Sequence, residues 1–164
     1  MKKMLNNQLV GLLAVFCICL NTVHAETDVI AVITPKTSKI QKLEKGELSL
    51  IYLRKKLYTS EGNRIIPINL TSSHIVRKQF TSIVLGGLPE AQSEYWNEAY
   101  YHGITPPHVV ASEDAAVKFV EITPGAIAYI NACKLTDMVK PVAWISATGI
   151  FLQSPPTMQC SELK

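Results

Sequence analysis

A hydroxyl-rich turn between a predicted strand and a predicted helix is the segment best suited to chemistry. Thr71, Ser72 and Ser73 follow an apolar run over 65–70 and precede a helical pattern. Free N–H groups at a helix start, with hydroxyls beside them, can hold an anion. Arg77 lies one turn into this helix and would add positive charge. We therefore predict an oxyanion site made of this turn and Arg77. The alternative is ordinary capping by Ser72 or Ser73, with Arg77 solvated.

Common motifs of enzymes and cofactor sites are absent from the sequence. It contains no GxxxxGK[ST], GxGxxG, HExxH, GxSxG or CxxC pattern. The histidines His74, His102 and His108 lack the spacing of metal ligands. We therefore expect no metal and no cofactor, and we expect that the protein is not an enzyme.

The N-terminus has the pattern of a cleavable secretory signal. Lys2 and Lys3 precede an apolar run of 12 residues, Leu9 to Leu20, and Val23 and Ala25 occupy the positions that signal peptidase recognises. A membrane span needs roughly 20 residues, so the run is short for an anchor. We predict cleavage after residue 25 and a periplasmic location. An uncleaved anchor or lipidation at a cysteine of the run are the alternatives.

Removal of the signal leaves one domain and two cysteines. We predict an α/β domain over 26–153 and a C-terminal tail over 154–164, since this length supports one core. Cys133 and Cys160 can form a disulfide in an oxidising compartment, or they can remain free buried thiols.

Charge is distributed unevenly along the mature chain. Residues 26–80 carry 10 Lys and Arg against 5 Asp and Glu, whereas residues 81–164 carry 4 against 8. The near-neutral total argues against a nucleic-acid partner. An anionic partner would be drawn to the first half.

Strands alternate with helices along the mature chain. Strands are expected over 28–34, 65–70, 108–111, 126–130 and 139–145, and helices over 43–53, 74–85, 89–100 and 113–122. Pro67 inside the second strand indicates an edge or a strand end. This alternation predicts a layered α/β fold with at least partly parallel pairing.

The order of several short motifs resembles the periplasmic phosphate-binding proteins of ABC transporters, in particular short single-domain relatives of the type 2 periplasmic binding-protein class. The motifs are Val32–Pro35 with Leu43–Leu53, Gly62–Asn69, Thr71–Phe80, Tyr95-Trp96, Pro107–Ala116 and Pro124–Ile130. The resemblance implies a layered sheet with flanking helices, equivalent mainly to one lobe of such a protein. It also implies an anion loop at Thr71–His74.

The sequence departs from this family pattern at the anion loop and elsewhere. The family's Ser-Gly-Thr loop is replaced by Thr71-Ser72-Ser73-His74, and Arg54 stands where glycine is common.

The resemblance and these departures together leave two candidate functions. The first is binding of a phosphate-like oxyanion for ABC-type uptake, with a membrane permease as partner. The second is a degenerate accessory or interaction module of the cell envelope that has lost small-ligand binding.

Overall fold

The computed structural model describes residues 29–157 and Cys160. The predicted signal segment lies outside these residues. The elements are β1 (Ile30–Pro35), α1 (Lys45–Tyr52), β2 (Ile66–Leu70), α2 (Ile75–Leu85), η1 (Pro89–Gln92), α3 (Ser93–Tyr101), β3 (His108–Val110), α4 (Glu113–Ile122), β4 (Ala126–Asn131), η2 (Ala132–Lys134), β5 (Val139–Ile145) and β6 (Phe151–Leu152).

A six-stranded mixed sheet runs through the molecule in the order β3-β2-β4-β1-β5-β6. β2 pairs in parallel with both β3 and β4. β1 pairs antiparallel with β4 and β5, and β5 pairs antiparallel with β6. The predicted α/β class with partly parallel pairing is confirmed.

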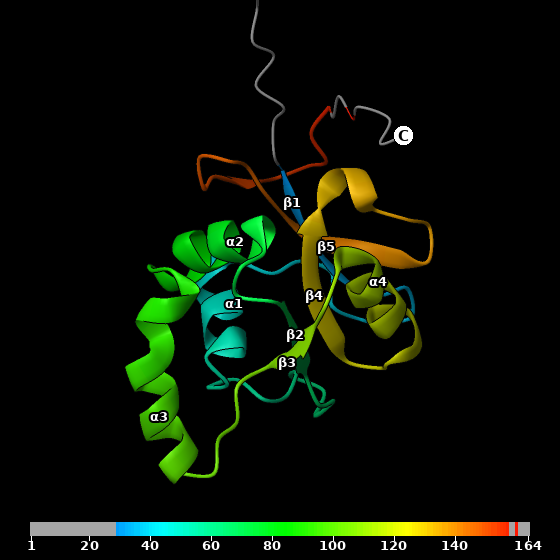
Figure 1. Cartoon of the computed structure of the whole chain (residues 1–164). Helices are drawn as coiled ribbons and strands as arrows, with labels where there is room; N and C mark the ends of the chain where they lie inside the picture. Colours follow the sequence, from blue (N-terminus) through cyan, green and yellow to red (C-terminus); the bar gives the residue numbers. More distant parts are fainter. Residues whose placement is uncertain (1–28, 158–159, 161–164) are drawn as a thin grey trace, which may run out of the picture.

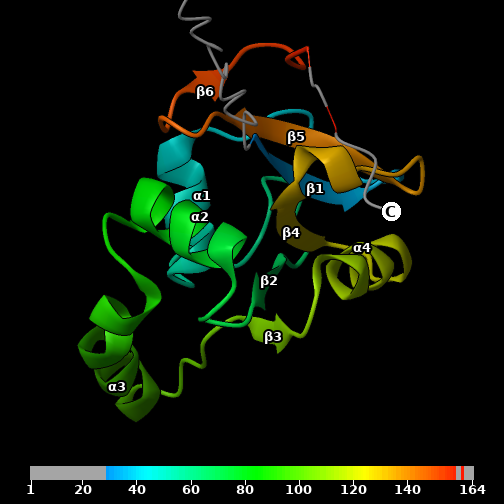
Figure 2. The ribbon, with the colours of Figure 1, turned by 45° about the horizontal axis from the view of Figure 1, so that its top comes forward.

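Helices cover both faces of this sheet. α1 and α2 lie together on one face and α4 lies on the other, whereas α3 extends away from the sheet (Figures 1 and 2). All six residues of β1 are buried. Strands covered on both faces are nearly continuously apolar, which explains why β1 and β4 have mostly apolar sequences.

Pro67 lies near the start of an interior strand, so of the two expected positions the strand end is confirmed and the edge strand is not. β2 pairs with β4 through Ile66 and Pro67, and it pairs with β3 only from Ile68 onward. Pro67 therefore occupies the start of the strand, where β3 does not reach. Its missing N–H costs no bond to β3.

Three aromatic side chains join α1, α2 and the sheet on one face. Phe80 and Tyr129 stack with ring centroids 3.9 Å apart, and Tyr52 meets Phe80 edge-on at 4.7 Å. The Tyr52 hydroxyl lies 3.3 Å from the Ile68 carbonyl oxygen and 3.2 Å from that of Ile127. The three rings are fully buried. This cluster fixes α2, and hence the turn before it, on the sheet.

The observed elements differ from the expected ones in several places, including α1, which begins at Lys45 rather than at residue 43. The helix expected over 89–100 divides into η1 and α3, with proline at the start of η1. α2 begins at Ile75, one residue later than expected. The short elements η2 and β6 were not expected.

Candidate functional site

The carboxyl ends of the parallel strands β2, β3 and β4 meet at one edge of the sheet. α2, α4 and η2 begin at this edge, each directly after one of these strands. Ligands of α/β sheets usually bind at such an edge. We call this region the α2 junction and define it by residues 71–74, 112–113 and 131–134.

The predicted hydroxyl turn forms part of the α2 junction. Ser72 and Ser73 are exposed and Thr71 is half-buried. The hydroxyls of Thr71 and Ser73 lie 3.5 Å apart, and the His74 N–H donates to the Thr71 carbonyl at 3.0 Å. The structure thus gathers the three predicted residues in one surface turn before α2. Their role in binding stays a prediction.

His74, rather than Ser72 or Ser73, caps α2. Its Nδ1 accepts a hydrogen bond from the Val76 N–H at 3.3 Å. Because an accepting nitrogen carries no hydrogen, the ring hydrogen is on Nε2. One of the free N–H groups that an oxyanion would use at this helix start is therefore already bound to the protein's own imidazole.

A buried carboxylate, that of Glu113, lies beside the start of α2. Its side chain is only 7% exposed, and Oε1 lies 3.8 Å from both His74 Nε2 and Lys134 Nζ. Oε2 accepts a hydrogen bond from the Asn131 N–H. A bound oxyanion would use the same three kinds of partner, namely an N–H group, an imidazole and an ammonium group. A carboxylate already among them repels a second anion, and burial weakens the screening of that repulsion.

Arg77 is buried rather than solvated. It is 9% exposed, and Nη1 donates to the Tyr129 hydroxyl at 3.5 Å. That hydroxyl donates to Asn69 at 3.1 Å and accepts from the Leu70 N–H at 3.4 Å. Arg77 Nε is buried and has no partner among the described residues. The structure thus brings Arg77 to Tyr129 and the end of β2, and none of its hydrogen bonds among the described residues reaches the hydroxyl turn.

We expect alkaline pH to destabilise the fold through Tyr52 and Tyr129. Burial raises the pKa of both phenols above the usual 10.0, and the charge of Arg77 opposes this only in part. Below about pH 10 both phenols are protonated in the folded and the unfolded state, so the free energy of unfolding does not change. Above about pH 10 the unfolded state loses these protons first, because the pKa is higher in the folded state. Each phenol then lowers the free energy of unfolding by about 1.4 kcal/mol per pH unit. Urea unfolding at several alkaline pH values measures this slope. The Tyr129→Phe variant should show a shallower decline, and an identical slope in both proteins would contradict the prediction.

The resemblance placed His74 in the anion loop but not as the cap of α2, and the sequence did not identify Glu113 or Lys134 as residues of the α2 junction. Glu113 was expected only as the first residue of the helix over 113–122. The usable signal is position, since each of the three lies within a few residues of the end of a predicted parallel strand. Such ends share one edge of the sheet.

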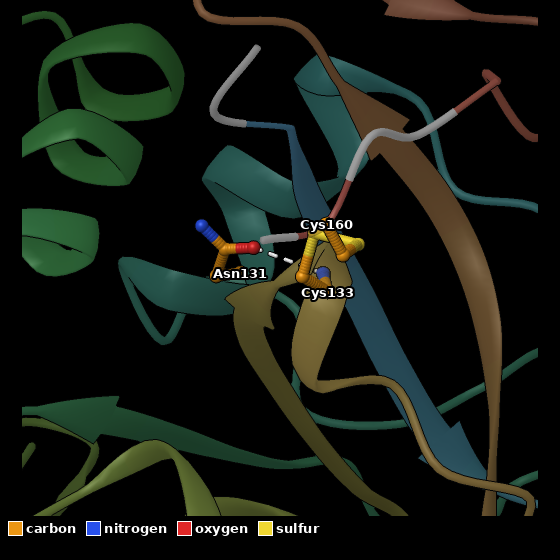
Figure 3. Close-up of a disulfide and its surroundings, with 3 residues drawn as sticks. All are labelled: Asn131, Cys133 and Cys160. Carbon is orange, nitrogen blue, oxygen red and sulfur yellow. Dashed lines mark hydrogen bonds between the residues drawn. A yellow bond between two sulfur atoms is a disulfide. The ribbon is translucent and has the colours of Figure 1, made fainter. Parts of the chain in front are cut away.

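A disulfide joins η2 to the C-terminal tail at the same edge of the sheet. Cys133 and Cys160 are bonded, with Cα atoms 5.5 Å apart (Figure 3). The Cys133 N–H also donates to Asn131 Oδ1 at 2.9 Å. Both bonds hold η2, which carries Lys134, close to the end of β4.

Removing this disulfide should lower the stability of the fold. The bridge spans 27 residues, for which loop-closure entropy gives about 3.5 kcal/mol. We expect a Cys133→Ser/Cys160→Ser variant to lose that amount in urea unfolding. A reductant should weaken the wild-type protein by a similar amount and leave the variant unchanged. Equal sensitivity of both proteins to reductant would contradict the assignment.

Two further findings concern residues 29–157 and Cys160. No group of three or more His, Cys, Asp or Glu side chains in this part is placed to hold a metal ion. None of its helices is long and apolar enough to cross a membrane.

The comparisons with known proteins first define a fold class. No protein-family model and no curated protein matches the sequence. Solved structures of phosphate-binding proteins from ABC transporters do match. Their sequence identities to this chain are low, so the similarity shows the fold and nothing more. The fold is that of about one lobe of such proteins.

Three of these structures illustrate the similarity. A Clostridium perfringens protein described as a phosphate ABC transporter substrate-binding protein with bound phosphate has a TM-score of 0.60 and 21% identity, over 71% of this chain and 45% of that chain. An ABC-type phosphate transport receptor from Vibrio cholerae has a TM-score of 0.57 and 16% identity, over 71% and 46%. A Planctomyces limnophilus protein described as a possible phosphate binding protein has a TM-score of 0.55 and 16% identity, over 72% of this chain and 42% of that chain. The chain therefore spans less than half the length of the structures it matches.

Proposed function

We propose that this protein is an accessory or interaction module of the cell envelope, and that its α2 junction does not hold a small oxyanion. The fold is that of a binding-protein lobe, so we assign it a binding role rather than a catalytic one. The observation that carries the proposal is the buried carboxylate of Glu113 at the junction. The Glu113 carboxylate and the His74 imidazole accept hydrogen bonds from the N–H groups that an oxyanion would need.

The single lobe supports the same proposal. A ligand at the edge of one lobe is covered from one side only, and water competes for its remaining hydrogen-bond sites. Affinity for a small anion depends on burying and satisfying it on all sides. A lone lobe whose junction contains an acid is a weak anion receptor.

The proposed envelope location rests on two features. The first is the signal-like pattern over residues 1–25. The second is the disulfide between Cys133 and Cys160, because such bonds persist in oxidising compartments. Crosslinking in intact cells, followed by identification of a stable protein partner, would test the interaction role directly.

The part played by Glu113 is tested by removing its charge. Glu113→Gln keeps an oxygen that accepts from the Asn131 N–H and abolishes the repulsion of an incoming anion. Asp114→Asn is the matched control, since Asp114 is exposed in the same first turn of α4. Calorimetry with phosphate should detect saturable millimolar binding in Glu113→Gln but not in the wild type or Asp114→Asn. Wild-type binding as tight as that of Glu113→Gln would contradict the proposal.

Binding of a phosphate-like oxyanion for ABC-type uptake is the second candidate, and Arg77 favours it. A nearly buried guanidinium with an unpartnered Nε, and with no ion pair among the described residues, is an uncompensated charge that a bound anion would neutralise. This candidate predicts that phosphate raises the melting temperature of the wild type, and that Ser72→Ala/Ser73→Ala and Arg77→Met each abolish the rise. No rise in the wild type would exclude it.

A further inference from the structure

A second candidate site lies at the amino ends of the parallel strands, whereas the α2 junction lies at their carboxyl ends. A cavity of about 390 Å³ is formed by the segment after β1, the segment before β2 and the turn before β4. Pro124 and Gly125 contribute its lining from that turn. Its volume falls in the range of small-molecule sites, about 300–1,000 Å³.

Hydroxyl groups supply much of the polar lining of this cavity. Ser38 Oγ accepts from the Ile40 N–H at 3.2 Å, and Thr59 Oγ1 accepts from the Asn63 N–H at 3.2 Å. Each hydroxyl that accepts in this way still has its own hydrogen to donate. The lining can therefore donate to the oxygens of a hydroxylated ligand.

The charges around the cavity are unbalanced toward positive. Lys39 and Glu61 line it and neutralise each other across 3.1 Å. Arg64 also lines it and forms no ion pair with any described carboxylate. One residue that lines the cavity thus carries a positive charge with no ion-pair partner among the described residues.

Arg54 reinforces the positive charge beside Arg64. Burial lowers the pKa of the Arg54 guanidinium, and the nearby charge of Arg64 lowers it further. Arg54 has a left-handed backbone with φ 60°, and its Nε is buried without a partner among the described residues. The two guanidiniums repel each other, and neither forms an ion pair with a described carboxylate, so a bound anion would relieve the repulsion.

We infer that this cavity binds a monosaccharide phosphate, with Arg64 holding the phosphate and the hydroxyl lining holding the sugar. Guanidinium groups bind phosphate oxygens through paired hydrogen bonds. The inference concerns a different edge of the sheet from the proposed function and goes beyond it. A phosphate ligand at this cavity also agrees with the excess of basic residues over 26–80.

The inference is tested by titration with glucose 6-phosphate, using amide NMR shifts of protein produced from the full chain. We expect saturable shifts over residues 37–40 and 59–64 at millimolar ligand, and much weaker binding of glucose alone. Arg64→Ala should lower the affinity for glucose 6-phosphate by about tenfold or more. Lys118→Ala, an exposed lysine on α4, is the matched control and should leave the affinity unchanged.

Specific outcomes would overturn this inference. These are no saturable shift with glucose 6-phosphate, equal affinity for glucose, or equal effects of Arg64→Ala and Lys118→Ala. Shifts that Ser72→Ala/Ser73→Ala abolishes would instead place binding at the α2 junction. That last result would contradict the proposed function as well, whereas the others leave it standing. Arg64 is exposed, so we expect Arg64→Ala to fold, and a matching circular dichroism spectrum checks this.

Discussion

Replacing Phe80 by alanine is expected to lower the free energy of unfolding by about 3–5 kcal/mol. The ring stacks on Tyr129 and meets Tyr52 edge-on, so its loss leaves a cavity between α1, α2 and β4. Nothing else in the aromatic cluster can fill that space, because its remaining members hydrogen-bond to the sheet through their hydroxyls. Urea unfolding followed by circular dichroism measures the loss.

Ile75→Ala is the matched control for the Phe80 prediction. Ile75 lies on the same helix and is 70% exposed, so its truncation should change the free energy of unfolding by less than about 0.5 kcal/mol. A loss below about 1 kcal/mol for Phe80→Ala, or similar losses for the two variants, would show that the cluster does not anchor α2.

Substituting Gly125 by alanine should have a comparably large effect, for a steric reason. Gly125 has φ +80°, and a Cβ at this position would lie 2.1 Å from the Arg64 carbonyl oxygen. This close approach allows the Ile66 N–H to donate to the Gly125 carbonyl at 2.9 Å, where β2 and β4 begin their pairing. An added methyl group must push the two strands apart. We expect a loss above about 3 kcal/mol, or failure to fold.

Gly62 separates the steric effect from the cost of the left-handed backbone. Its φ is +81°, and a Cβ there would meet nothing within 4 Å. Gly62→Ala should therefore lose only about 1–2 kcal/mol. Parallel urea melts of the two variants provide the comparison. Equal losses would mean that the approach of residue 125 to Arg64 does not matter for folding.

Much of the fold could be predicted from the sequence because local and global signals agree. β1 and β4 are mostly apolar runs, as is typical of strands buried on both faces. The Ser112 cap followed by two acids marks the start of α4, and its hydroxyl accepts from the Ala115 N–H. The resemblance placed a glycine at the position of Arg54, and Arg54 has the left-handed backbone that favours glycine.

The candidate site was less predictable because its decisive features are long-range. An acid in the first turn of a helix suits a solvated surface as well as a buried junction, so the burial of Glu113 is invisible in local sequence. The His74 cap depends on where the backbone enters α2, and by residue type alone Ser72 and Ser73 are better capping candidates than a histidine. The burial of Arg77 depends on Tyr129, which is 52 residues away in the sequence.

The central claim is that the α2 junction is filled by the protein's own groups and does not hold a small oxyanion. The most direct measurement is a phosphate titration of the wild-type protein, followed by the backbone amide NMR shifts of residues 71–77 and 131–134. The account predicts no saturable shift in these amides at millimolar phosphate. A saturable shift there that Ser72→Ala/Ser73→Ala abolishes would contradict it.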